Sequence, residues 1–233
     1  MKKKNKINSV GFIIDGNRRW AVENGISKLE GHRYGMETVK KAIKWSQEMD
    51  IKNLVFYVFS TENWNRVKIE VETLLALFSE FLEKEIDAFF VPNDLAVKFI
   101  GSRDRFSSRI QKLMDRAEDR TKNNKTNVFL AVSYGGRLEI TEAIKKLSRE
   151  LSKQDIEKLT EKDFEKFLWS QELPDPEIII RTGGHARLSN FLTWKSVYSE
   201  LFFTDTKWPA FSKDEFFEII KIFQEKVKIN NGK

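Results

Sequence analysis

Residues 10–21 read VGFIIDGNRRWA, and they show the pattern that the rest of the chain repeats. The first five are uncharged and mostly β-forming, which predicts a short buried strand. Asp15, Gly16 and Asn17 then favour a turn that tolerates positive φ and brings backbone N–H groups close to a ligand. A carboxylate beside two guanidiniums suits a metal-bound phosphate, because Asp binds hard cations and Arg binds phosphate oxygens. The alternative is an ordinary strand-to-helix turn with surface arginines.

The composition bounds the class of protein. The chain has 233 residues, of which 40% are hydrophobic, enough for a substantial core. It has no cysteine and two histidines, which excludes disulfides, thiolate chemistry and a multi-histidine zinc site. The net charge of +6 suits an anionic ligand or a membrane surface. We expect a basic flexible tail at residues 1–8 and a single domain at residues 9–233.

The N-terminus, MKKKNKINSV, is basic, but no apolar stretch of signal-peptide length follows it. No run approaches the ~18 apolar residues of a membrane span. We therefore expect a cytoplasmic protein. The lysines of the tail are interpreted as a solvated segment. The alternative is weak attraction to anionic lipid, and so peripheral contact with the membrane.

Apolar runs alternate with helical periodicity along the chain. We predict strands at residues 10–14, 53–59, 95–100, 127–134 and 177–180, and helices at 35–50, 70–90, 104–122, 138–151, 160–169 and 212–228. This alternation predicts an α/β fold with a mostly parallel central sheet flanked by helices. Residues 191–203 are apolar and aromatic and fit neither the helix pattern nor the strand pattern. The aromatic richness of residues 191–211 predicts a surface for a homodimer.

The predicted helix at residues 70–90 has an unusually wide apolar arc. Leu74, Leu77 and Phe81 lie beside the stripe that would dock the helix on its sheet. One interpretation is a helix buried by protein on two sides. The other is that the additional face lines a tunnel for an apolar ligand.

Four predicted strands end in polar turns, DGNRRW, STENWNR, YGGR and RTGGHARLSN. Ligands bind outside the carboxyl ends of strands in an open parallel sheet, so these turns should line one crevice. It would gather Arg18, Arg19, Arg66, Arg137, Arg181 and Arg187 around Asp15 and Glu200. Such a site fits two polyanionic groups and a divalent ion. His32, just before the predicted helix at 35–50, would add an anion site at a helix N-terminus. The chain has no GxxxxGK[ST] or GxGxxG motif.

DGNRRWA, GH at 31–32, FSTENWNR, SYGGR, IIIRTGG, RLSNF and YSELFF occur in an order and spacing that resemble the cis-prenyltransferases, most closely bacterial undecaprenyl diphosphate synthases. The resemblance covers residues 9–211. It implies an α/β domain with a hydrophobic tunnel, a homodimer, and Mg²⁺-dependent condensation of isopentenyl diphosphate with an allylic diphosphate, commonly farnesyl diphosphate. It implies a long-chain cis-polyprenyl diphosphate such as undecaprenyl diphosphate as the product.

The resemblance also implies roles for individual residues. Asp15 would be the catalytic carboxylate that manages magnesium and the departing diphosphate. The allylic diphosphate would lie among Gly16, Asn17, Arg18, Arg19, Trp20, Lys28 and His32. Asn63 would assist proton removal, within the segment Ser60, Thr61, Glu62, Trp64 and Arg66. Isopentenyl diphosphate would be held by Arg181, Arg187, Leu188 and Ser189, and Glu200 would be the second magnesium ligand.

The chain departs from the family pattern at Ser9, Ile14, Val67, His185 and Ala186. We expect these changes to affect the outer coordination shell of the magnesium ion, the turnover rate and the product length, but not the class of reaction. A shorter-chain synthase and a non-catalytic subunit of the same fold stay open as alternatives, although Asp15, Asn63 and Glu200 favour an active enzyme. A nucleic-acid-binding protein is disfavoured, because the basic residues are spread over helices without a known binding motif.

Overall fold

Six short apolar strands form one sheet at the centre of the molecule. A computed structural model describes residues 7–230. The strands are β1 (Ser9–Ile13), β2 (Asn53–Ser60), β3 (Leu95–Ile100), β4 (Thr126–Tyr134), β5 (Ile178–Arg181) and β6 (Glu200–Phe203). They are all parallel, in the order β3-β4-β2-β1-β5-β6. The predicted α/β fold with a parallel sheet is therefore confirmed, and every strand ends at the same edge of the sheet.

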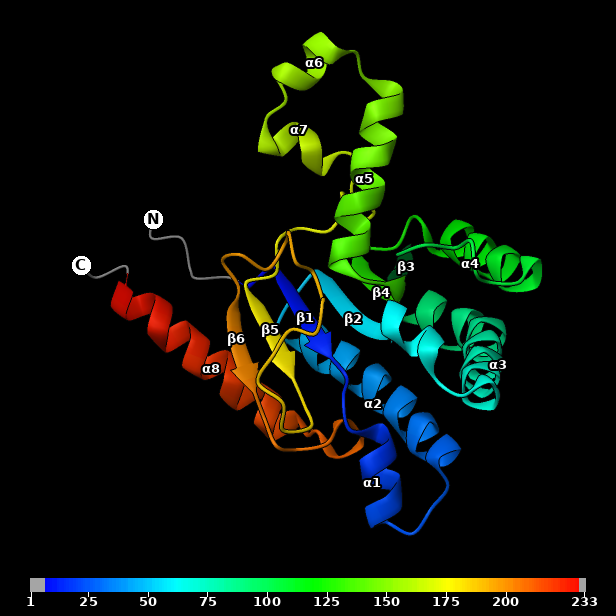
Figure 1. The fold of residues 1–233 in the computed structure, drawn as a ribbon. Helices are drawn as coiled ribbons and strands as arrows, with labels where there is room; N and C mark the ends of the chain where they lie inside the picture. The colour runs from blue at the N-terminus through cyan, green and yellow to red at the C-terminus, as the bar shows by residue number, and fades with distance from the viewer. Residues whose placement is uncertain (1–6, 231–233) are drawn as a thin grey trace.

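Helices connect the strands and cover the sheet (Figure 1). They are α1 (Asn17–Glu23), α2 (Lys28–Glu48), α3 (Lys68–Glu85), α4 (Ser108–Thr121), α5 (Gly136–Glu150), α6 (Lys153–Glu157), α7 (Glu161–Glu165) and α8 (Lys213–Asn230). Short turns of other helix types follow β2, at Thr61–Asn65, and α3, at Ile86–Phe90 and Val91–Asn93, and precede α8, at Trp208–Ala210. In Figure 1, α5 to α7 project beyond the end of the sheet.

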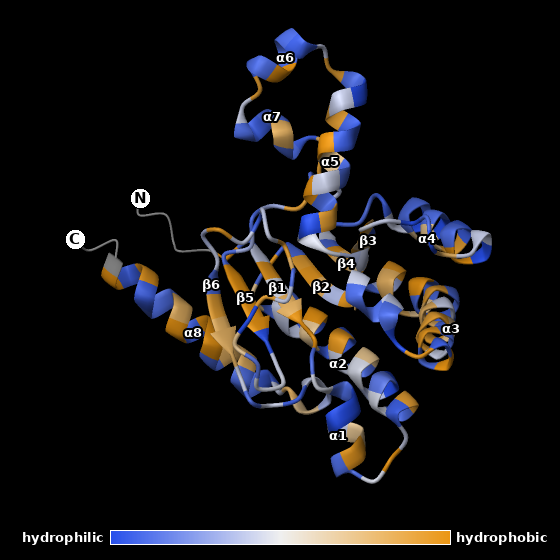
Figure 2. Cartoon of the chain, viewed as in Figure 1, coloured by the Kyte–Doolittle hydropathy of each residue, from blue (hydrophilic) through white to orange (hydrophobic). Residues whose placement is uncertain are grey.

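The two faces of the sheet are covered differently. Alternate strand residues, such as Val10 and Phe12, point into a large core that they share with α2, α3, α4 and α8. The rings of Phe12 and Phe56 stack there with centroids 4.8 Å apart. The intervening residues, such as Val55 and Tyr57, point to the other face, where irregular chain around Phe191 covers them. Figure 2 shows β2, β5 and β6 as largely hydrophobic.

The chain enters the fold earlier than predicted. Ile7 is buried, and the carbonyl of Asn8 accepts hydrogen bonds from the backbone N–H groups of Lys52 and Asn53. The last two residues of the predicted tail therefore belong to the domain, while residues 1–6 lie outside the described residues. Among residues 7–230, no helix is long and apolar enough to cross a lipid bilayer.

Two helical features near the first turn differ from the prediction. The seven-residue helix α1 was not predicted, and α2 begins at Lys28 instead of residue 35. Ser27 caps α2, because its side chain accepts from the N–H of Glu30 and the Glu30 carboxylate accepts from the N–H of Ser27. His32 therefore lies inside the helix, and its predicted position beside free helix N–H groups is wrong.

Candidate functional site

A cavity of about 700 Å³ opens at the carboxyl ends of β1, β2 and β5. Its mouth is polar, and predicted site residues line it: Asp15, Gly16, Asn17, Arg18, Arg19, Lys28, His32, Ser60, Asn63, Arg66, Arg181 and Ser189. The parallel sheet brings them together from segments far apart in the sequence. The prediction of a crevice lined by turns that follow different strands is confirmed for three of the four turns.

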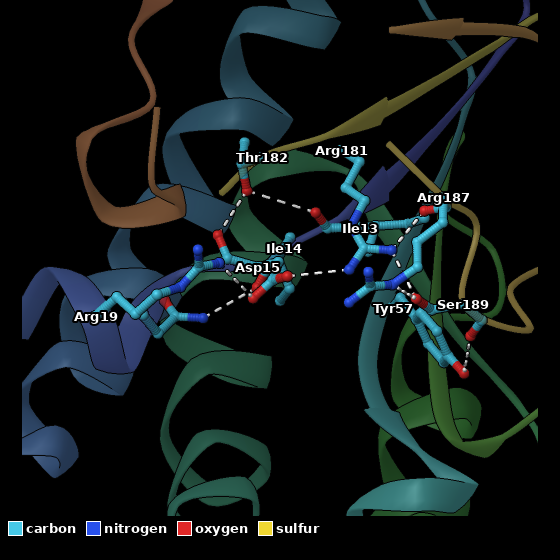
Figure 3. Close-up of polar contacts among 10 residues, drawn as sticks. Ile13, Ile14, Asp15, Arg19, Tyr57, Arg181, Thr182, Arg187 and Ser189 are labelled. Atoms are coloured by element: carbon cyan, nitrogen blue, oxygen red, sulfur yellow. Dashed lines mark hydrogen bonds and ion pairs between the residues drawn. The ribbon is translucent and has the colours of Figure 1, made fainter. Parts of the chain in front are cut away.

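Asp15 lies between two arginines at the centre of the mouth (Figure 3). Its Oδ2 accepts from Nη2 of Arg181 at 3.0 Å, and its Oδ1 lies 3.3 Å from Nη2 of Arg19. The Asp15 carbonyl accepts from Oγ1 of Thr182 at 2.8 Å and from the N–H of Trp208 at 3.0 Å. These contacts tie the turn after β1 to the turn after β5, so the position of the carboxylate is set by backbone as well as by charge.

Close backbone contacts shape this mouth. Gly16 has φ +107°, and a Cβ there would lie 2.8 Å from the Lys207 side chain. On α2, Gly31 and Gly35 are one turn apart, and a Cβ on either would meet Asn17 of α1 within 2.5 Å. These glycines allow α1 and α2 to approach each other. This close approach places Arg18 beside His32, and both side chains line the mouth.

A second group of charges lies where α1, α2 and α3 meet at the mouth. Oε1 of Glu70 is 2.8 Å from Nη1 of Arg18 and 2.8 Å from Nη1 of Arg66. Burial, together with the positive charges of Arg66 and Arg18, lowers the pKa of His32 to about 4. His32 is therefore neutral near pH 7. Glu70 was not identified from the sequence, where it looked like an ordinary helix-surface charge.

The segment after β2 contributes to the site in a more limited way than predicted. Oδ1 of Asn63 accepts from the backbone N–H of Ser60 at 2.9 Å, so the amide oxygen is engaged in a cap. Trp64 packs in the core against Phe59 and Phe106, with its Nε1 donating to Ser133. Asn63 and Ser60 line the cavity, whereas Trp64 supports the wall from behind.

Arg181 holds the loop that follows β5. Its side chain is 5% exposed, and its Nη1 donates to Oγ of Ser189 at 2.7 Å and to the carbonyl of Arg187. Nε of Arg187 lies 3.3 Å from the same Ser189 hydroxyl, so the two guanidiniums are neighbours (Figure 3). Tyr57, which was not predicted, donates from its hydroxyl to the carbonyls of Tyr134 and Ser189 and steadies this loop. Nε of Arg181 is buried without a hydrogen-bond partner, a donor that suits an added anion.

Other predicted residues lie around this mouth without lining the cavity. They are Trp20, Thr61, Glu62, Trp64, Arg187, Leu188 and Arg137. Trp20 packs against Tyr34, and Leu188 packs on the face of the sheet covered by Phe191. Arg137 is in the first turn of α5, is exposed, and does not line the cavity. Its predicted place in the crevice is therefore wrong.

Glu200 is far from Asp15 within the chain. It pairs in register with Ile178 at the start of β5, whereas Asp15 follows Ile13, which pairs with Arg181 at the end of that strand. About five residues of strand separate the two levels, roughly 15 Å. Glu200 instead lies 3.1 Å from Nζ of Lys226. One ion therefore cannot contact both carboxylates of the same chain, and Glu200 as the second magnesium ligand stays a prediction.

The inner part of the cavity is apolar. Its walls come from α2, α3, β2, β4 and the loop before α4. They include Met36, Val39, Leu74, Leu75, Leu77, Phe78, Phe81, Phe106, Leu130 and Val132. The additional face of α3 therefore faces a cavity, as one of the two interpretations of its sequence predicted. A polar, cationic mouth that leads into an apolar interior suits a ligand with an anionic head and a hydrocarbon tail.

Comparison with known proteins agrees with this geometry. The family model described as putative undecaprenyl diphosphate synthase matches residues 13–230. The chain therefore belongs to the cis-prenyltransferase family, and it is a prenyltransferase of the cis-polyprenyl diphosphate synthase type.

Two relatives and one solved structure define its place in that family. The chain is 40% identical to a farnesyl-diphosphate-specific ditrans,polycis-undecaprenyl-diphosphate synthase of Wigglesworthia glossinidia brevipalpis, over 95% of this chain and 86% of the relative. It is also 40% identical to a geranylgeranyl-diphosphate-specific tritrans,polycis-undecaprenyl-diphosphate synthase of Thermoplasma acidophilum, over 97% and 89%. Its fold matches lavandulyl diphosphate synthase from Lavandula x intermedia, solved with dimethylallyl diphosphate, with a TM-score of 0.88 and 31% identity over 94% and 95% of the two chains.

Proposed function

We propose that this protein condenses isopentenyl diphosphate with an allylic diphosphate, farnesyl diphosphate by preference, and releases a long-chain cis-polyprenyl diphosphate such as undecaprenyl diphosphate. The observation that carries the proposal is that one cavity combines arginines at its mouth with an apolar interior. Two relatives that are each 40% identical to this chain are named for different allylic starters. The choice of farnesyl diphosphate is therefore part of the proposal and is decided by the assay below. A shorter-chain synthase differs only in where growth stops.

The allylic diphosphate is proposed to lie over the turn Gly16–Arg19, beside His32 and Lys28. Guanidiniums in this position bind the phosphate oxygens in a fork and stabilise the negative charge that develops as the diphosphate leaves. Neutral His32 supplies a hydrogen bond without adding a further charge. The hydrocarbon tail enters the apolar interior, where burial is worth ~0.8 kcal/mol per CH₂.

Isopentenyl diphosphate is proposed to bind at Arg181, Arg187 and Ser189. Arg181 can keep Nη2 on Asp15 while its guanidinium supplies positive charge beside the ligand phosphate. This arrangement places the second substrate next to the leaving diphosphate of the first. Asn63 orients the reacting end from the side of β2, and diphosphate itself is the proton acceptor, because the amide oxygen of Asn63 is engaged with Ser60.

Asp15 is the residue proposed to hold Mg²⁺. Within the described part of the chain, no three His, Cys, Asp or Glu side chains gather as a metal site. One carboxylate is nevertheless enough for Mg²⁺ when substrate phosphates complete its shell, and Asp15 is 33% exposed at the mouth. Bound there, the ion would neutralise charge on the leaving diphosphate.

The protein is proposed to be a homodimer. The aromatic residues of 191–211 contribute less surface than the sequence suggested, because Phe191, Leu192 and Trp208 are fully buried. The edge strand β6 and the turn before it still expose Val197, Tyr198, Leu201 and Phe203. An exposed apolar edge strand favours pairing with a second copy. Sedimentation at micromolar concentration should therefore give a dimer.

One assay tests the proposed reaction. The purified protein is incubated with farnesyl diphosphate, labelled isopentenyl diphosphate and Mg²⁺, and the product is sized. We expect a long polyprenyl product and no turnover in excess EDTA. A product of one or two added units would favour the shorter-chain synthase. No product from any allylic starter would favour the non-catalytic subunit.

A further inference from the structure

Glu70 occupies an unusual position between the two half-exposed arginines of the mouth. One of its two carboxylate oxygens, Oε1, accepts from both Nη1 of Arg18 and Nη1 of Arg66, each at 2.8 Å. The three side chains are neither buried nor free, with exposures of 40% for Arg18, 25% for Glu70 and 31% for Arg66. A carboxylate that is shared in this way occupies the donors that a phosphate oxygen would use.

Glu70 also belongs to the cavity-facing stripe of α3. Glu70, Leu74, Leu77 and Phe81 follow one another at spacings of four, three and four, so they share one face of the helix. The last three line the apolar interior, and both arginines line the mouth. Glu70 is therefore the charged outer end of an otherwise apolar stripe. It does not itself line the cavity, but both arginines that it pairs with do.

The contacts of Glu70 contrast with those of Asp15. Arg181, the partner of Asp15, is nearly buried and is also bound to Ser189 and to the backbone of the loop after β5. Arg18 and Arg66 make no contact of that kind with backbone in the described structure; their ion pairs are to Glu70. Half-exposed ion pairs are weak because water competes for both partners. The Glu70 pairs can therefore be exchanged for another anion at small cost.

We propose that Glu70 is a built-in competitor for the diphosphate group. It neutralises Arg18 and Arg66 in the empty enzyme, is displaced by the allylic diphosphate, and re-forms its ion pairs as pyrophosphate leaves. The inference rests on the proposed function of the mouth as a diphosphate site. Its consequence is that Glu70 weakens the binding of every diphosphate at the mouth, and thereby speeds the release of pyrophosphate.

The test is the binding of inorganic pyrophosphate to the full chain, measured by calorimetry without a second substrate. Glu70→Gln keeps the shape of the side chain and removes its charge, so we expect pyrophosphate to bind about three- to tenfold more tightly. Glu72→Gln is the matched control, because Glu72 is on the same helix, faces Lys68, and carries the same charge. The control should leave the affinity within about twofold of the wild type.

A second variant guards against a folding effect. Glu70→Asp keeps the charge but withdraws it by one methylene from the arginines, and it should tighten pyrophosphate binding by less than Glu70→Gln. Steady-state kinetics give an independent readout: Glu70→Gln should lower both KM for the allylic diphosphate and the inhibition constant of pyrophosphate. A residue that merely held the arginines in place would raise both values when changed.

The outcomes separate this inference from the proposed function. If Arg66→Ala weakens pyrophosphate binding but Glu70→Gln leaves it unchanged or weaker, the mouth binds diphosphate and the competitor role is wrong. If neither the wild type nor Glu70→Gln binds pyrophosphate, the diphosphate site itself is wrong, and the competitor role falls with it. Tighter binding by Glu70→Gln alone, with Glu72→Gln unchanged, supports both.

Discussion

The mouth and the inner wall of the cavity are built in different ways. At the mouth, Oδ2 of Asp15 lies 3.0 Å from Nη2 of Arg181, although the two residues are 166 positions apart in the chain. Along the wall, by contrast, the single helix α3 supplies Leu74, Leu77 and Phe81, whose spacing of three and four residues places them on one face. The mouth therefore depends on the parallel sheet that brings distant strand ends together, whereas the wall depends on local periodicity. We infer that the chemistry and the length of the product can be changed independently of each other.

The largest effect is expected at Asp15. Asp15→Asn keeps the shape of the side chain but removes the charge that pairs with Arg181 and Arg19 and that is proposed to hold the metal. We predict that kcat falls more than tenfold, while the arginines still bind both substrates. Steady-state kinetics and calorimetry with each substrate measure the two properties.

A second carboxylate at the same mouth is the control for Asp15. Glu23 lines the cavity, and its ion pair, at 3.0 Å, is with Lys207. Glu23→Gln should leave kcat within about threefold of the wild type. Equal losses in the two variants would show that the mouth needs negative charge in general and not Asp15 in particular.

Arg181 tests the division of the mouth into two substrate sites. Charge-assisted hydrogen bonds of ~1.5–3 kcal/mol predict that Arg181→Ala raises KM for isopentenyl diphosphate roughly ten- to hundredfold. KM for the allylic substrate should change less, and Arg137→Ala, at an exposed position outside the cavity, should change neither. A similar rise for both substrates would mean that the two sites are assigned wrongly.

The wall should control the product and not the rate of the first condensation. Phe81 lies eleven residues beyond Glu70 along α3, about 16 Å deeper than the mouth. We predict that Phe81→Ala or Leu77→Ala lengthens the product, because each opens space along the tail. The length of the product is measured by chromatography of the labelled polyprenyl chains.

Leu82 provides the matched control for the wall. It is buried in the core on the same helix but does not line the cavity. Leu82→Ala should therefore lower the free energy of unfolding by about 2–5 kcal/mol and leave the product unchanged. If all three variants only lower the melting temperature, α3 is core and the tail lies elsewhere.

The smallest predicted effect is the pH dependence at His32. Its pKa is about 4 in the folded protein and ~6.5 when unfolded, so the unfolded chain binds more protons between these values. The free energy of unfolding therefore falls as the pH is lowered from 7 to 5, by about 1–2 kcal/mol from this residue. His32→Asn should show a correspondingly smaller loss in thermal melts at the two pH values. If the variant and the wild type lose the same stability between pH 7 and pH 5, groups other than His32 cause the loss.

Five of the six strands were predictable because each is an apolar run bounded by a polar turn, as in residues 10–17. Strand β6 was not predicted, because the apolar and aromatic residues 191–203 fitted neither a helix nor a strand pattern. Helix α1 was missed because it has seven residues and begins NRRW, without an apolar face. The early start of α2 was missed because its apolar periodicity begins only near Met36. The capping pair Ser27 and Glu30 was a signal in the sequence that could have located it.

The site was predictable where a residue directly follows a strand, as Asp15 follows β1. It was not predictable where orientation or register decides the outcome. Arg137 follows β4 but is exposed in the first turn of α5 and does not line the cavity. Glu200 lies at the amino end of β6, in register with Ile178. Glu70 was missed for a related reason, since a charged helix residue is normally on the surface and only the packing of α1 against α2 brings Arg18 to it.

The most direct test of the account is a crystal structure of the protein with the non-reactive analogue farnesyl thiodiphosphate and Mg²⁺. The account predicts that the diphosphate contacts Arg18, Arg19 and His32, with the metal on Asp15. It also predicts that the farnesyl tail runs along α3 past Leu74 towards Leu77. A tail lying outside the cavity, or a diphosphate bound away from the turn after β1, would contradict the claim that one cavity holds both the reacting head and the growing chain.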